Sequence, residues 1–89
     1  MTISQTKAFA KAVKKLKTNQ KSDLDAAVHA LLAAPESGDP KKGDLSDVRV
    51  YKFNMVNQLA LLAYSYDEAA PRLTLLALGT HENFYRDMK

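Results

Sequence analysis

The first part of the chain carries apolar residues at helical spacing. Between Lys7 and Lys17, Phe9, Val13 and Leu16 recur on one side while lysines fill the other faces, which predicts an amphipathic helix. From Thr18 to Ala34 a second apolar stripe predicts another helix, formed by Leu24, Val28, Leu31 and Leu32. The link between the two is so short that we expect an antiparallel helical hairpin.

The periodicity changes after the loop at residues 35–47, "PESGDPKKGDLSD", which contains two prolines and two glycines. Three segments of alternating or apolar residues follow, "VRVYKF", "QLALLAYSY" and "RLTLLAL", separated by the turn segments "NMVN" and "DEAAP". Strands joined by such short turns predict an antiparallel three-strand meander. The residues "TIS" before the first helix could add a short edge strand.

The second and third predicted strands are apolar on both alternating sets of positions. Both faces of the sheet therefore need cover, at least in part. The helical hairpin can cover one face, and the other must meet the C-terminal segment, a partner, or both. The sequence thus predicts one α+β domain over residues 1–89: an N-terminal two-helix hairpin packed on an antiparallel sheet, with a short C-terminal helix.

Composition restricts the setting of this domain. The chain of 89 residues has no cysteine, so it offers neither a disulfide framework nor a thiolate metal site, and we expect a reducing, cytoplasmic environment. The longest apolar run, "LALLAY", is far too short to span a bilayer. We therefore expect no membrane association.

Charge is unevenly distributed along the chain. Residues 1–21 hold six lysines and no acid, whereas residues 22–40 hold four acids and no lysine or arginine. A basic element of this kind indicates a polyanionic partner. The alternative is that these lysines only solvate the exposed face of a helix.

The C-terminal segment "GTHENFYRDMK" is the best candidate for chemistry. If residues 81–88 form a helix, His81 and Tyr85 are four positions apart and lie on one face. Histidine can accept or donate a proton near neutral pH. The alternative is that His81 is an ordinary first-turn residue and that Tyr85 is a packing aromatic with a solvated hydroxyl.

The order of elements resembles that of the RelE/ParE superfamily of toxins from bacterial type II toxin–antitoxin systems. The segment "KKGDLSDVRVYKF" is similar to the family's loop and basic second strand, and "LALGTHENFYR" is similar to its last strand with the glycine, basic residue and tyrosine that follow. The resemblance covers nearly the whole chain.

In the ribonuclease branch of this superfamily, the resemblance implies cleavage of messenger RNA in the ribosomal A site. A ribose 2′-hydroxyl attacks the adjacent phosphate, which requires a base, an acid and cations but no metal and no cofactor. Matching positions make His81, Tyr85 and Arg49 the expected catalytic residues. The expected RNA-binding residues are Lys52, Arg86, Lys41, Lys42 and Lys14.

The same resemblance implies partners. We expect a small acidic antitoxin that wraps the helices or blocks the C-terminal segment, and the ribosome with its messenger RNA as the target. "LALLAYSY" and "LTLLAL" contain no basic residue, whereas the best-known ribonuclease members carry several on these strands. The alternative is therefore the branch that poisons DNA gyrase without nuclease chemistry.

Overall fold

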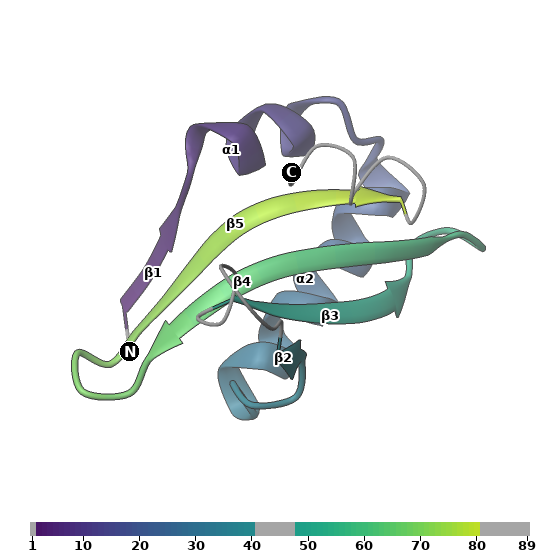
Figure 1. The fold of residues 1–89 in the computed structure, drawn as a ribbon. Coiled ribbons are helices and arrows are strands. Elements are labelled where there is room, and N and C mark those ends of the chain that lie inside the picture. Colours follow the sequence, from purple (N-terminus) through teal and green to yellow (C-terminus); the bar gives the residue numbers. More distant parts are fainter. Residues whose placement is uncertain (1, 41–47, 81–89) are drawn as a thin grey trace.

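The computed structural model describes residues 2–40 and 48–80, which form two helices and a five-stranded sheet (Figure 1). The helices are α1 (Lys7–Lys14) and α2 (Thr18–Ala33), and the strands are β1 (Thr2–Gln5), β2 (Asp39–Pro40), β3 (Arg49–Asn54), β4 (Leu59–Asp67) and β5 (Arg72–Thr80). The α+β class and both predicted helices are confirmed, although α1 ends three residues earlier than the pattern predicted. The predicted C-terminal helix lies outside the described residues.

The strands lie in the order β1-β5-β4-β3-β2. Consecutive strands from β2 to β5 pair antiparallel, but β1 runs parallel to β5. The expectation of a purely antiparallel sheet was therefore wrong. The chain passes through both helices after β1, and its last strand, β5, then pairs with β1 in the parallel direction. The short β2 was also missed, because it lies in the proline- and glycine-containing segment that predicts a loop. Proline is tolerated there because β2 is an edge strand.

Thr6 connects β1, α1 and β5. Its hydroxyl accepts a hydrogen bond from the Phe9 backbone N–H (3.1 Å) and so caps the N-terminus of α1. The same hydroxyl donates to the carbonyl of Leu76 (2.7 Å). The Thr6 N–H donates to the carbonyl of Leu75 (3.0 Å). The helix therefore begins at a position fixed against the last strand.

The main hydrophobic core lies between the helices and one face of the sheet. In Figure 1, α2 runs behind β4 and β3, and α1 lies beside β5. The buried members of this core come from both helices and from β4 and β5: Phe9, Leu24, Leu31, Leu62, Tyr64, Leu73 and Leu75. Both helices therefore pack on the same face of the sheet through one hydrophobic core.

A second cluster of buried residues lies on the opposite face, formed by Val50, Leu61 and Ala63 with Val48, Leu76 and Ala77 packed against it. The sheet is therefore apolar on both faces, as the sequence predicted. A β-bulge opposite the Ala63/Tyr64 step leaves Leu76 outside the pairing with β4. The extra residue shifts the alternation, so Leu75 and Leu78 both belong to the main core while Leu76 packs on the second cluster.

Tyr64 of β4 attaches the segment after α2 to the centre of the sheet. The Tyr64 hydroxyl donates to the carbonyl of Pro35 (2.7 Å) and accepts from the N–H of Gly38 (2.9 Å). A Cβ on Gly38 would lie 2.6 Å from this hydroxyl oxygen, so only glycine allows the backbone to approach the buried ring this closely. Burial raises the pKa of Tyr64 above its ordinary value of 10.0.

The β3–β4 turn adopts an unusual conformation. Met55 and Gln58 exchange backbone hydrogen bonds, and the two central residues have positive φ, 52° at Val56 and 64° at Asn57. Asparagine tolerates this region, but for a β-branched residue such as valine it is strained. The Val56 N–H donates to the carboxylate of Asp23 on α2 (2.8 Å), so the helix holds the turn in place.

Within residues 2–40 and 48–80, no helix is long and apolar enough to cross a membrane.

We expect Tyr64→Phe to lower the free energy of unfolding by about 1–3 kcal/mol near neutral pH, because it leaves the Pro35 carbonyl and the Gly38 N–H without their buried partner. The raised pKa also predicts that wild-type stability is fully present below pH 10.0 and declines as pH rises above it, since the folded state resists deprotonation of Tyr64. The Tyr64→Phe variant should lack the part of this alkaline loss of stability that comes from deprotonation of Tyr64.

Urea unfolding of both proteins at neutral and alkaline pH measures the two effects. Tyr66→Phe, which removes a hydroxyl from the same strand, is the control. A Tyr64→Phe variant as stable as the wild type would show that the two hydrogen bonds contribute nothing.

We expect Val56→Asn to raise the free energy of unfolding by about 1 kcal/mol, because asparagine adopts positive φ at lower cost. Val56→Thr keeps the branched Cβ and should show no such gain. Thermal unfolding of the three proteins compares them, and equal or lower stability of Val56→Asn would show that the turn is not strained.

Candidate functional site

Arg49 begins β3 on the face of the sheet that the helices cover. Its guanidinium Nη1 donates to the carbonyls of Gly38 (3.0 Å) and Glu36 (3.3 Å). It pairs with Tyr64 of β4, and its positive charge lowers the pKa of that tyrosine, although burial outweighs this effect. Arg49 thus contacts the same segment after α2 that Tyr64 holds.

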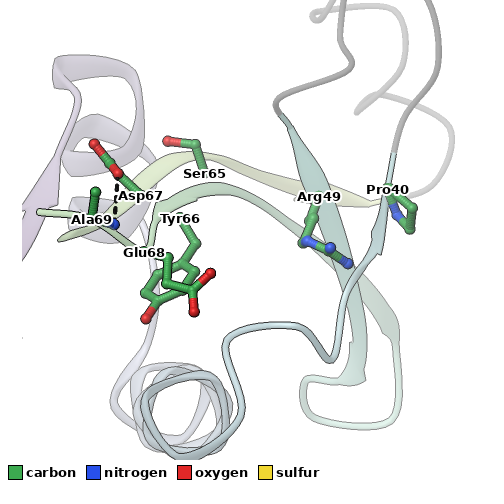
Figure 2. Close-up of a pocket in the computed structure, with 7 residues that line it drawn as sticks. All are labelled: Pro40, Arg49, Ser65, Tyr66, Asp67, Glu68 and Ala69. Atoms are coloured by element: carbon green, nitrogen blue, oxygen red, sulfur yellow. Dashed lines mark hydrogen bonds between the residues drawn. The ribbon is translucent and has the colours of Figure 1, made fainter. Parts of the chain in front are cut away.

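An open pocket of about 570 Å³ lies beside Arg49 (Figure 2). The residues that line it come from β2, β3, β4 and the turn after β4: Pro40, Arg49, Ser65, Tyr66, Asp67, Glu68 and Ala69. One carboxylate oxygen of Asp67 accepts from the Ala69 N–H (3.0 Å). With two carboxylates and one guanidinium in its lining, the pocket does not favour a phosphate group.

Lys52 lies on the opposite face of the sheet. It is exposed, it shares its side of β3 with Val50 of the second cluster, and it pairs with Leu61 of β4. Leu61 in turn pairs with Gly79 of β5. Lys52 therefore lies in one row with Gly79, two strand spacings or roughly 10 Å away, where the segment "GTHENFYR" leaves the sheet.

The sequence predicted a catalytic role for Arg49 and RNA binding for Lys52, and in the structure these two residues lie on opposite faces of β3. Residues 49 and 52 on one strand face opposite sides, and the guanidinium of Arg49 turns to the carbonyls of Glu36 and Gly38. The structure brings Lys52 and Gly79 into one row and does not bring Arg49 to it. The catalytic role of Arg49 stays a prediction.

The remaining predicted site residues divide into two groups. Lys14 is exposed in the last turn of α1, which also carries Lys11. His81, Tyr85, Arg86, Lys41 and Lys42 lie outside the described residues.

Among the residues that the structure describes, no group of three or more His, Asp or Glu side chains is placed to bind a metal ion.

Sequence reasoning missed the polar side chains of the β3–β4 turn. "NMVN" was interpreted only as a connection, yet Asn54, Asn57 and Gln58 are all exposed there beside Lys52. Three amides within five residues were the available signal. The contact that holds this turn, between the Val56 N–H and Asp23, links residues 33 positions apart and has no signal in the local sequence.

Solved structures of similar fold include a chain of the intact E. coli RelBE toxin–antitoxin complex, with 15% identity over 89% of this chain and 94% of that one and a TM-score of 0.72. The YoeB/ParE toxin from Agrobacterium tumefaciens is 14% identical over 91% of this chain and 99% of that one, with a TM-score of 0.71. The Helicobacter pylori protein HP0892 is 26% identical over 94% and 98%, with a TM-score of 0.57.

A comparison with curated protein sequences gives no match. The model of one protein family, described as the ParE-like toxin of type II bacterial toxin–antitoxin systems, matches residues 3–89. This match spans both helices, the whole of β3 to β5 and the segment after them. The chain is therefore a member of the ParE-like toxin family, within the RelE/ParE superfamily of type II toxin–antitoxin systems.

Proposed function

We propose that this toxin is a ribosome-dependent messenger RNA endonuclease that stops translation. The observation that supports this most is the row Lys52–Leu61–Gly79, in which the exposed Lys52 lies two strands from Gly79, the residue from which the segment carrying His81 and Tyr85 continues. It lies on the face of the sheet opposite the core that contains both helices. A phosphate bound near the exposed end of this row would meet the cation, and the segment with the titratable groups continues from the other end.

The proposed reaction needs only side chains. His81 takes the proton from the ribose 2′-hydroxyl or delivers one to the leaving 5′-oxygen, and Tyr85 carries or orients the other proton. Lys52 stabilises the extra negative charge that the phosphate gains in the transition state. Arg86 adds a second cation, while Lys14, Lys41 and Lys42 hold more distant phosphates of the RNA.

Arg49 stays in this proposal as a catalytic residue because of its place on the basic strand. Its contacts with Glu36 and Gly38 mean that it would have to exchange two backbone hydrogen bonds for RNA. A change at Arg49 therefore alters both the fold of residues 35–38 and any catalysis, so it is a poor first test of the mechanism.

The proposed protein partner is a small acidic antitoxin. The RelBE structure is by its name a toxin–antitoxin complex, and a RelE mutant was solved with an antitoxin RelBc peptide. In this chain the exposed lysines of α1, including Lys7, Lys11 and Lys14, suit an acidic segment.

A second candidate function is inhibition of DNA gyrase. The family description names ParE. In addition, Arg72 is the one basic residue on β4 and β5 as the structure describes them, so a ribonuclease would have few cations on its sheet. In this alternative the sheet face binds protein and no proton is transferred.

Expression of the chain in a bacterial host distinguishes the two functions. The endonuclease proposal predicts an early fall in pulse-labelled protein synthesis without DNA breaks, because messenger RNA is lost first. DNA breaks and filamentation with continued early translation would support gyrase inhibition. Normal growth of a permissive host would contradict both functions.

We expect His81→Gln to slow RNA cleavage by roughly a hundredfold or more, because glutamine retains hydrogen bonding but cannot exchange a proton. Lys52→Gln should also slow cleavage, with a smaller loss expected when salt screens the charge. Lys7→Gln, which changes an exposed lysine to which the proposal assigns no contact with RNA, is the control. Cleavage of a ribosome-bound message by equal amounts of soluble protein measures the effects, and full activity of His81→Gln would remove His81 from the mechanism.

A further inference from the structure

The β3–β4 turn, Asn54–Leu59, has features that folding alone does not explain. Val56 adopts a conformation that costs a β-branched residue of order 1 kcal/mol or more. The residue is 40% exposed, so it is only partly packed against the rest of the protein. A carboxylate of α2 nevertheless fixes the turn through the Val56 N–H, and Met55 of the same turn is buried.

The exposed surface of the turn combines amides with apolar groups. Asn54, Asn57 and Gln58 are exposed, and each carries both a donor and an acceptor. Three large hydrophobic residues are exposed among the described residues, and two of them belong to this turn: Val56 lies between Asn54 and Asn57, and Leu59 (44% exposed) follows Gln58. The turn therefore offers hydrogen-bonding edges next to small apolar surfaces.

The charge on the Lys52 side of the turn favours RNA as the occupant. From Val48 to Tyr66 the chain contains no acidic residue, and Lys52 is exposed on this side of β3. The Asp23 carboxylate that contacts the turn belongs to α2, which packs on the other face, and it accepts from the Val56 N–H. Lys52 and Asn54 lie on the same side of β3 because they are two residues apart. An amide side chain can bind a base that presents a donor beside an acceptor, as adenine does, through two hydrogen bonds.

The position of the turn connects it with the proposed reactive segment. Ala60 of β4 pairs with Thr80 of β5, so β5 ends beside the residue that follows the turn. Asn54 pairs with Leu59, and Lys52 lies one pleat further along β3. A nucleotide held by Lys52 can therefore reach the turn with its base.

We propose that the β3–β4 turn reads a base of the RNA substrate, with Asn57 and Gln58 binding the base edge and Lys52 holding a neighbouring phosphate. This inference rests on the proposed endonuclease function and adds a determinant of cleavage-site preference. Asp23 acts as a positioning residue, because it orients the turn without touching RNA. Val56 is retained in a strained conformation because it supplies apolar surface against the base.

The test measures cleavage rates on ribosome-bound messages that differ only at one base near the cut. Asn57→Gly keeps a residue that accepts positive φ but removes the amide, so we expect the preference between bases to fall by about tenfold or more while the turn still forms. Asn57→Asp keeps the shape and replaces the donor by an acceptor, which should shift preference towards cytosine, whose exocyclic amine donates.

Gln5→Ala, which removes an exposed amide from β1 on the far side of the sheet, is the matched control and should leave the preference unchanged. Asp23→Ala should weaken the preference in the same direction as Asn57→Gly. Cleavage with an unaltered preference in both Asn57 variants would overturn this inference and leave the endonuclease function standing. No cleavage by the wild-type protein would overturn both.

Discussion

The structure depends on complete burial of the middle of β4. Residues 60–64 are each at most 1% exposed, although neighbouring side chains on a strand face opposite sides of the sheet. Both faces must therefore be covered, and both helices share the core on one of them. The bulge in β5 changes which of its apolar residues meet each face, so that Leu75 and Leu78 join the main core while Leu76 and Ala77 pack on the second cluster.

Tyr64 extends that constraint to the chain outside the sheet. Its ring is part of the main core while its hydroxyl bonds the backbone on either side of Glu36 and Ser37. Arg49 contacts carbonyls of the same segment from the neighbouring strand. These contacts direct the chain from the end of α2 into β2, which closes the second edge of the sheet. Arg49 of β3, which the sequence pattern assigns to catalysis, thus also makes contacts that hold the fold together.

The two faces of β3 consequently carry different kinds of polar group. Arg49 lies on the face of the main core, where its bonds are to the backbone. Lys52 and Asn54 lie on the other face, in the rows that lead to Gly79 and to the turn. The fold therefore separates cations that are close in sequence, and it brings Lys52 near a segment that begins 27 positions later in the chain.

The sequence by itself determined the α+β class, both helices, the three long strands and their need for cover on both faces, because these depend on local periodicity. Its motifs also indicated the toxin family that the family model then identified. Tertiary structure alone decided the parallel pairing of β1 with β5, the short β2, the side to which Arg49 turns, and the strained Val56 turn held by Asp23. Each of these depends on contacts between distant residues, and hydrophobic periodicity along the chain carries no record of such contacts.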